Sequence, residues 1–242
     1  MGKPLIVIGA GDHAKVLLDI LLEQGQEVIG LADKSVATGT LIYGIPVIGD
    51  DNAVMAYKSE DVELVNGIGS VGSMVSRAKI YEGFKSKGYH FKTVVHESAV
   101  VSNRAELCEG AQVLAGAIVT TDAKIGEDSI INTNASVDHA CIIGRHCHIA
   151  PGCVLCGCVT VGDRTHIGTG SSIIQGITIG SDVLIGAGSV VIKNIEDSVK
   201  VYGVPAAMRG SINMFSIIGG GVRTDSVRNA LLPKRLVGGR YA

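Results

Sequence analysis

The stretch Ile143-Gly-Arg-His-Cys-His-Ile149-Ala-Pro-Gly-Cys-Val-Leu155 decides the fold, because an aliphatic residue returns at every sixth position. The same register continues without a break from Val95 to Val191, and all seventeen of its positions hold Val, Ile or Leu. In most hexads, the residue four positions after the aliphatic one is small. Such a repeat predicts a parallel β-helix, in which each hexad forms one short strand and a turn and three hexads complete a triangular coil.

The register also assigns half of the six cysteines. The small inward position is held on consecutive hexads by Cys141, Cys147 and Cys153, which predicts that they are core residues. The remaining three show no spacing typical of a metal site: Cys108, Cys156 and Cys158. Because none of the six requires a disulfide, we expect a cytoplasmic protein.

Outward from the repeats, residues 1–92 show the pattern of half a Rossmann fold. The apolar strand Leu5–Ile8 is followed by the turn Gly9-Ala-Gly-Asp-His-Ala14 and by helical spacing from Lys15 to Gln24. Gly9 and Gly11 allow the backbone to approach a ligand, and the start of the helix attracts phosphate. The pattern continues with strands predicted at 27–32 and 62–68 and a helix at 75–87. The alternative interpretation is that the glycines only form a tight turn.

The length of this first segment limits its ligand. Fewer than about 95 residues hold one mononucleotide half, not the two halves that bind a dinucleotide. We therefore expect a nucleotide-linked small molecule and not NAD. Asp33, which ends the second predicted strand, is placed to accept a hydrogen bond from a base or ribose, or else is an ordinary turn aspartate. The predicted organisation is an α/β domain at 1–92, an all-β β-helix at 93–195, and a C-terminal segment and tail at 196–242.

His139 is the main candidate for chemistry in the repeats. It lies two residues past the inward Val137 and therefore near a corner of the coil. The residue 18 positions later is Gly157, which leaves space beside the imidazole, an arrangement suited to a general base near neutral pH. Asp138 is adjacent and could orient the ring, although neighbours on a strand tend to face opposite ways. A solvated corner histidine is the alternative.

The other histidines do not predict a metal. A hexapeptide carbonic anhydrase needs two zinc histidines five residues apart, whereas His146, His148 and His166 follow His139 by 7, 9 and 27 positions. His148 and His166 are 18 residues apart and should stack, which fits a surface ladder as well as a site. We therefore expect no bound metal.

Composition excludes other classes of function. The formal charge of −2 predicts no general attraction to nucleic acid or to an anionic membrane. The apolar stretch Leu5–Ile8 is too short for export, and no uncharged run has the character of a membrane span. The mean hydropathy of +0.36 indicates that additional surface is buried in an oligomer.

Both predicted domains together resemble the sugar O-/N-acyltransferases of the NeuD type, in particular PglD-like acetyltransferases acting on nucleotide-linked 4-amino sugars. The resemblance covers about residues 3–209. It rests on the Gly-Ala-Gly-x-His start, the Asn-Thr-(x)4-Asp-His segment, the Ile-Gly hexads and Gly203-Val-Pro-Ala206. It implies a left-handed coil, a homotrimer, acetyl-CoA bound between neighbouring β-helices, and a sugar nucleotide held by the N-terminal domain.

Carried over position by position, the resemblance implies that His139 is the general base and Asp138 its acidic partner. Many relatives have Asp or Glu where this chain has Ala140, so Asp138 or a backbone carbonyl is left to orient the ring. With Gly9 of the turn, the expected substrate contacts are Gly11, His13, Asp33, Ser70, Asn132 and His148. The expected coenzyme-binding positions are Gly157, whose amide would face the thioester carbonyl, Thr169 and Ala187.

The expected function is N-acetylation of the sugar amine by direct attack on acetyl-CoA, in the synthesis of a surface polysaccharide or glycan. Two alternatives stay open. An O-acetyltransferase of a sialic-acid-like sugar would share the donor site, and a non-catalytic sugar-nucleotide-binding protein would bind nucleotide without consuming acetyl-CoA. The sequence does not choose between UDP, GDP and dTDP.

Overall fold

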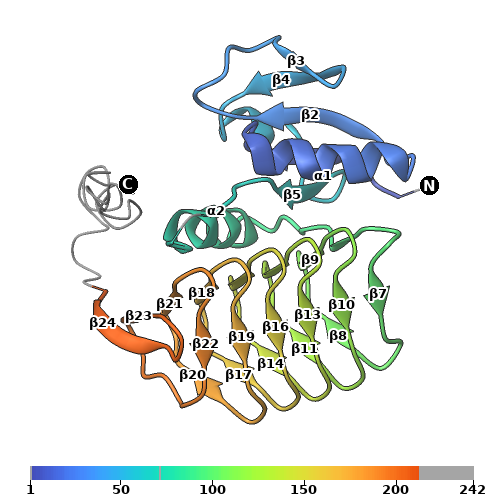
Figure 1. Cartoon of the computed structure of the whole chain (residues 1–242). Helices are drawn as coiled ribbons and strands as arrows, with labels where there is room; N and C mark the ends of the chain where they lie inside the picture. Colours follow the sequence, from blue (N-terminus) through green and yellow to red (C-terminus); the bar gives the residue numbers. More distant parts are fainter. Residues whose placement is uncertain (1, 71, 213–242) are drawn as a thin grey trace, which may run out of the picture. The chain divides into compact units, whose positions relative to one another are not determined.

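The computed structural model describes residues 2–70 and 72–212, which combine two kinds of architecture (Figure 1). A small α/β domain comes first, and a β-helix follows it. The predicted tail beyond residue 212 lies outside the described residues.

The α/β domain is built on a five-stranded sheet in the order β3-β4-β2-β1-β5. Its elements are β1 (Leu5–Ile8), α1 (Asp12–Glu23), β2 (Val28–Ala32), β3 (Leu41–Ile42), β4 (Ile45–Gly49), a 3₁₀ helix η1 (Ala53–Ala56), β5 (Glu63–Asn66) and α2 (Val75–Lys85). β1 pairs in parallel with β2 and β5. The predicted strands and helices are present, with ends displaced by a few residues.

The hairpin of β3 and β4 was not predicted from the sequence. Its two-residue turn places Tyr43 at φ 50° and Gly44 at φ 82°. Both central residues of a type I′ turn need positive φ, and this turn matches the twist of a hairpin. The sequence feature that predicts this hairpin is Gly44 between two short apolar runs.

The β-helix has three sheets of parallel rungs, with an antiparallel strand added at one end. The face covered by the α/β domain, here the covered face, contains β6 (Val94–Val95), β9 (Gln112–Val113), β12 (Ile130–Ile131), β15 (His148–Ile149), β18 (His166–Ile167), β21 (Leu184–Ile185), β23 (Val199–Tyr202) and β24 (Ala207–Ser211). The sheet of this face thus continues past residue 195 through β23, which pairs in parallel with β21.

The other two faces are named by their outward residues. The apolar face contains β7 (Val100–Val101), β10 (Ile118–Val119), β13 (Ser136–Val137), β16 (Val154–Leu155), β19 (Ser172–Ile173) and β22 (Val190–Val191). The polar face contains β8 (Glu106–Leu107), β11 (Lys124–Ile125), β14 (Ile142–Ile143), β17 (Thr160–Val161) and β20 (Thr178–Ile179).

The hexad register fills the core of the β-helix. From Val113 to Val191 every aliphatic residue of the register is at most 1% exposed. Cys141, Cys147 and Cys153 are fully buried among them, which confirms their predicted place. Left-handed φ recurs at every sixth residue from Gly110 to Gly188, so each corner needs glycine or a residue that tolerates this conformation. Six of these corner positions carry glycine, and the other eight carry residues such as Asp128, Asn134 and His146.

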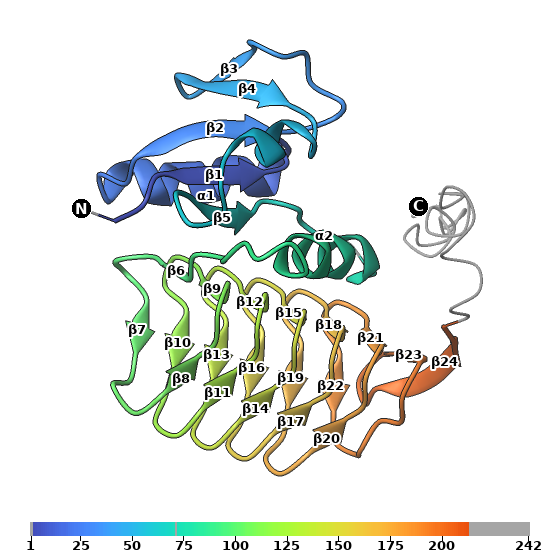
Figure 2. The same cartoon turned by 180° about the vertical axis from the view of Figure 1, so that it is seen from behind.

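The α/β domain packs on the covered face through an apolar layer. Leu17 and Leu21 of α1 share a buried cluster with Leu114 and Ile130 of the β-helix. The Gln24 side chain adds a hydrogen bond of 2.7 Å to the carbonyl of Val95. Figure 2 shows the arrangement from behind, with β5 and α2 drawn next to the rungs of the covered face.

Helix α2 is held by a buried ion pair at the corner between the covered and polar faces. The Arg77 and Asp128 side chains are fully buried, and their Nη2 and Oδ1 atoms lie 2.8 Å apart. His146, one rung beyond Asp128, approaches the other carboxylate oxygen at 3.0 Å through Nδ1. Asn66 Nδ2 donates to Asp128 at 2.9 Å. These contacts lock α2, and with it the loop after β5, onto the β-helix.

Candidate active site

A cleft of about 450 Å³ opens at the carboxyl ends of the parallel strands of the α/β domain. This edge of an open α/β sheet is where ligands usually bind. Its walls come from the loops after β1, β2, β4 and β5 and from α2: Gly9, Ala32, Asp33, Lys34, Ser35, Asp51, Ile68, Ser76, Lys79 and Ile80. Two lysines on this wall can balance the charge of phosphates.

Gly9 and Asp33 of the predicted set lie in this cleft. Gly9 has φ 98°, and a Cβ there would lie 2.9 Å from Ile68 Cδ1, so the turn needs glycine. Asp33 accepts the Ala10 amide at 2.8 Å through Oδ2 and the Ser35 amide at 2.7 Å through Oδ1. Asp33 therefore ties the two loops together and lines the cleft at once. Gly11 is the exposed N-cap residue of α1 and is not part of the cleft wall.

A second group of predicted residues meets where the two domains join, here the junction. His148 Nδ1 lies 2.8 Å from Ser70 Oγ, and its Nε2 lies 2.9 Å from Asn132 Nδ2. His13 Nε2 lies 2.8 Å from Gln112 Oε1. The junction therefore brings together Ser70 of the α/β domain and His148 of the β-helix, which are 78 positions apart in the chain.

Burial keeps the junction histidines neutral. It lowers the pKa of His13 to about 4 and that of His148 to about 3, in the latter case with help from nearby His166. The rings of His148 and His166 meet edge to face at 4.8 Å, and burial lowers the pKa of His166 to about 4. The pair therefore lies inside the junction and is not a surface ladder.

Sequence reasoning did not assign Gln112 and left His166 open. Both occupy outward positions on strands of the covered face, where neighbouring rungs place Val94, Ile130 and Leu184. A sequence feature could have indicated both residues. They are polar side chains at outward positions of an otherwise apolar sheet, and a polar group that becomes buried needs a hydrogen-bond partner.

His139 and Asp138 lie at the corner between the apolar and polar faces. Asp138 Oδ1 accepts hydrogen bonds from the His139 amide at 2.7 Å and the Thr120 hydroxyl at 3.1 Å, and lies 3.0 Å from His139 Nδ1. The His139 amide, and then its ring, hold the pKa of the Asp138 carboxyl below its usual range. Because a carboxylate only accepts, the Nδ1 of the neutral ring carries the proton, and Nε2 keeps a free lone pair.

The imidazole of His139 itself occupies the space that Gly157 leaves in the next rung. A Cβ at position 157 would overlap Cε1 and Nε2 of the ring. No group of the described residues accepts a hydrogen bond from the Gly157 amide. A lone pair and a free amide therefore lie side by side at one corner.

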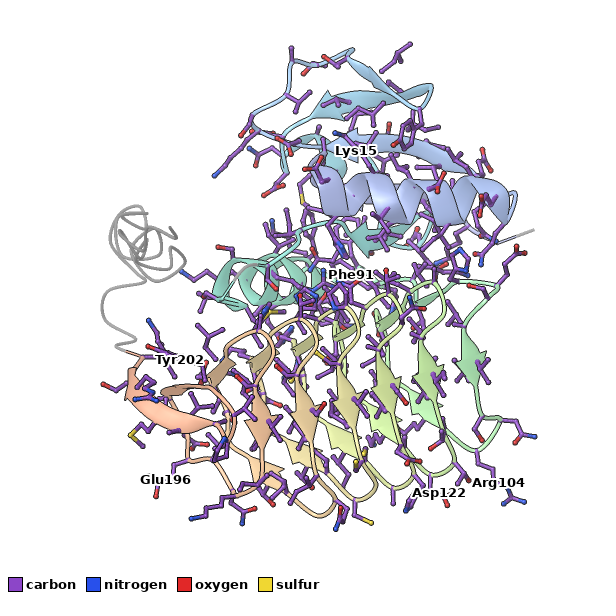
Figure 3. All side chains as sticks on the ribbon, viewed as in Figure 1. Lys15, Phe91, Arg104, Asp122, Glu196 and Tyr202 are labelled. Carbon is purple, nitrogen blue, oxygen red and sulfur yellow. The ribbon has the colours of Figure 1, made fainter. Side chains whose placement is uncertain are left out.

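The remaining predicted positions, Thr169 and Ala187, lie at another corner of the same chain. Both are exposed, one rung apart, where the covered face meets the apolar face. The apolar face separates them from His139. Figure 3 labels Arg104 and Asp122 on the His139 corner, at the edge of the β-helix far from the α/β domain. One chain therefore does not bring His139 together with the cleft, the junction or Thr169.

Within residues 2–70 and 72–212, no group of three His, Cys, Asp or Glu side chains could hold a metal ion. None of the helices in this described part is both long and apolar enough to cross a bilayer.

Comparison with known proteins agrees with both domains. Residues 4–84 match the family described as the PglD N-terminal domain, and residues 122–157 match the bacterial transferase hexapeptide family. A search of curated proteins found no match.

Several solved structures are similar over most of the chain. A histidine-to-asparagine variant of perosamine N-acetyltransferase from Caulobacter crescentus, in complex with CoA and GDP-perosamine, is 37% identical with a TM-score of 0.81, over 86% of this chain and 97% of that one. The acetyltransferase domain of PglB from Neisseria gonorrhoeae, solved also with acetyl coenzyme A, is 32% identical with a TM-score of 0.80, over 86% and 100%. WeeI from Acinetobacter baumannii is 25% identical with a TM-score of 0.76, over 85% and 99%.

These matches span both domains in the same order and reach 37% identity over 97% of one relative. The β-helix is thus the left-handed coil of the hexapeptide transferases, and acetyl-CoA is the co-substrate. The chain belongs to the PglD-like acetyltransferases of the hexapeptide-repeat family.

Proposed function

We propose that this enzyme transfers the acetyl group of acetyl-CoA to the amine of a nucleotide-linked 4-amino sugar, with His139 as the general base. The observation that carries the proposal is the hydrogen bond between Asp138 and His139 Nδ1, which leaves Nε2 free to accept a proton. A cleft in the α/β domain large enough for a nucleotide provides the second substrate site. Structures of similar proteins with CoA and GDP-perosamine support the choice of an amino sugar.

Acetyl-CoA supplies an activated acyl carbon when bound. The sugar amine forms its new bond to that carbon, the thioester C–S bond breaks, and the CoA sulfur leaves as thiolate. His139 Nε2 takes the proton that the amine loses, and this proton ends on the CoA thiolate. The Gly157 amide is placed to donate to the oxygen on which negative charge develops. Direct attack forms no covalent enzyme intermediate and therefore needs no cysteine nucleophile.

Each active site is shared between two copies of the chain in a homotrimer. His139 lies at one edge of the apolar face, and Asn132, Thr169 and Ala187 lie at the other edge. A closed ring in which unlike edges of neighbouring protomers meet brings the two halves together at every contact. The outward Val100, Ile118 and Val154 make the apolar face suitable for this contact. The number three follows from the family resemblance.

Charge placed on the apolar face should break the ring. The double substitution Ile118→Lys and Val154→Lys leaves unpaired lysines in the interface, and an uncompensated buried charge costs about 3–5 kcal/mol. We expect monomers in light scattering and loss of activity.

The matched control is Ile142→Lys on the polar face. Ile142 is also an outward aliphatic residue and has a similar exposure in the single chain, 51% against 39% for Ile118 and 44% for Val154. The control should remain trimeric. A trimer that survives the double substitution, or one lost with Ile142→Lys, would contradict the proposed interface.

Thiol release decides the reaction. With acetyl-CoA, GDP-perosamine should release CoA far faster than the matched sugar with a hydroxyl at C4, and mass spectrometry should show one added acetyl group. UDP- and dTDP-linked 4-amino sugars tested in parallel identify the nucleotide. Preferential release with the hydroxyl acceptor would favour the O-acetyltransferase alternative, and no release with any acceptor would favour a non-catalytic binding protein.

We place the reaction in the cytoplasm, in the synthesis of a surface polysaccharide or glycan. The six cysteines are free, which is usual for a protein kept in a reducing compartment. The polysaccharide role rests on the resemblance to proteins that act on nucleotide-linked amino sugars.

A further inference from the structure

The corner that carries Asp138 and His139 contains a third polar side chain, Thr120, which comes from the preceding coil. Thr120 lies 18 positions before Asp138 and occupies the equivalent place of its own coil, since β10 pairs with β13. A carboxylate only accepts, so the Thr120 hydroxyl donates to Asp138 Oδ1 at 3.1 Å. A chain of contacts therefore runs from Thr120 through Asp138 to the ring of His139.

The three hydrogen bonds that described residues make to the Asp138 carboxylate all fall on Oδ1. The His139 amide lies at 2.7 Å, the His139 Nδ1 at 3.0 Å and the Thr120 hydroxyl at 3.1 Å. The first two donors belong to the residue after Asp138, so both bonds can persist while the pair moves together at the corner. Only the bond to Thr120 ties the pair to a different coil.

Burial does not fix the geometry of this pair. The Asp138 side chain is 47% exposed and that of His139 is 58% exposed. Water competes for exposed charged groups, and side-chain entropy opposes holding them in one geometry. Ala140, which follows His139, has no polar side-chain atom that could hold the ring from the other side. An anchor outside the pair is therefore needed to define where the imidazole points.

Thr120 is suited to be this anchor because its own position is fixed. Its amide donates to the Val137 carbonyl at 3.0 Å, and its carbonyl accepts from the Ala123 amide at 3.4 Å. Its side chain is half-buried and β-branched, and a β-branched side chain has few χ1 rotamers. Little entropy is therefore lost when the hydroxyl is held toward Asp138.

We propose that Thr120 is a positioning residue for acetyl transfer, because its hydroxyl holds the Asp138 carboxylate against His139 Nδ1 and so keeps the lone pair on Nε2. This role rests on the proposed function of His139 as the general base. Thr120 touches no reacting atom, and the amine proton still passes to Nε2. Without the hydroxyl, the carboxylate can turn toward solvent, and the ring then populates the tautomer that is protonated on Nε2 and cannot accept the proton there.

The tautomer of His139 tests this contact without any substrate. In full-length protein with ¹⁵N-labelled histidine, at about pH 8 where an ordinary imidazole is neutral, the ring should be protonated mainly on Nδ1. Thr120→Val exchanges the hydroxyl for a methyl group of similar size and should increase the share of the form protonated on Nε2. Thr120→Ser keeps the hydroxyl and should not. An unchanged tautomer ratio in Thr120→Val would overturn the proposal, whatever the enzyme acetylates.

Steady-state kinetics separate positioning from substrate binding. Thr120→Val should lower kcat about 3- to 10-fold, the effect expected from one lost hydrogen bond. The KM values for acetyl-CoA and GDP-perosamine should stay close to those of the unmodified enzyme, and Thr120→Ser should recover most of the kcat. Normal turnover of Thr120→Val, or a change confined to KM, would contradict the assigned role.

The matched control is Thr160→Val on β17 of the polar face. Thr160 is also a half-buried threonine of a rung, and it lies outside the proposed site. This variant should keep the kcat of the unmodified enzyme. An equal loss in Thr160→Val would show that the effect of Thr120→Val comes from the packing of the rungs, and would overturn the proposal.

A double-mutant cycle tests whether Thr120 acts through Asp138. If it does, adding Thr120→Val to Asp138→Ala should lower kcat no further than Asp138→Ala alone. Losses that multiply would refute this route. Failure of the proposed function has a different sign: His139→Ala would then turn over normally, whereas the tautomer ratios of the Thr120 variants would still decide the contact.

Discussion

Replacing His139 with alanine will lower kcat by about 10²-fold or more, because a positioned general base contributes 10²- to 10⁴-fold. Thiol release with acetyl-CoA and GDP-perosamine measures the loss. CoA binding should be retained, since Gly157, Thr169 and Ala187 are untouched. The physical reason is that no other described side chain at this corner offers a lone pair oriented by a carboxylate as Asp138 orients His139 Nδ1.

The matched control is His90→Ala. The His90 side chain is 61% exposed and that of His139 is 58% exposed, so the two substitutions remove equally accessible imidazoles. The control should keep normal turnover. Near-normal turnover of His139→Ala would exclude His139 as the base.

Mixed trimers extend the same prediction to the shared site. His139→Ala removes one edge of the site, and Thr169→Tyr blocks the other edge. Each variant alone should be inactive, but random mixing of the two should leave about a quarter of the contacts between protomers with both edges intact. Activity that recovers on mixing supports a site shared between chains, whereas two inactive proteins that stay inactive would contradict it.

Asp128→Asn should lower the free energy of unfolding by about 3–5 kcal/mol, the largest stability effect that we expect from a single substitution. The change keeps the shape of the side chain and leaves the fully buried Arg77 without a countercharge. Asparagine also tolerates the left-handed backbone of position 128, which has φ 57°. For a chain of this size the loss corresponds to a fall in Tm of about 10 °C in a thermal melt followed by circular dichroism.

Glu106→Gln is the comparison for this stability prediction. It neutralises one partner of the Lys124–Glu106 pair, whose atoms are also 2.8 Å apart but whose side chains are exposed. Solvent screens exposed ion pairs and leaves them little net effect on stability, so this variant should melt close to the unmodified protein. If Asp128→Asn melts no lower than Glu106→Gln, the buried pair does not hold α2 on the β-helix.

The hexad register predicted the β-helix because one inward residue in six must be aliphatic. This requirement is visible in the sequence of every hexad. It also placed Gly157 beside His139, since rungs repeat every 18 residues. The contact between Asp138 and His139 was harder to predict. Alternation along a strand would turn the two side chains apart, but they lie at a corner, where the backbone bends and both side chains face outward.

The junction could not be predicted from spacing. Ser70 and His148 meet because helix α1 and the Arg77–Asp128 pair dock one domain on the other, and such docking leaves no local pattern. Gln112 shows the same limit, since its partners His13 and Asn66 come from the other domain. The predicted site residues His139 and Thr169 lie at two different corners of the β-helix. This separation became clear only once the structure assigned each residue to a face.

The parallel rungs also give the enzyme a fixed scale along its axis. Successive rungs are about 4.8 Å apart, so positions on one corner can change their separation only in whole steps. Position 175, the next after Gly157 on the His139 corner, carries Gln175. Whole-coil insertions of 18 residues would lengthen the β-helix while keeping every side chain on its face, and shorter insertions would rotate the downstream residues onto other faces. Whole coils can therefore be added to the scaffold without moving the residues of the site off their faces.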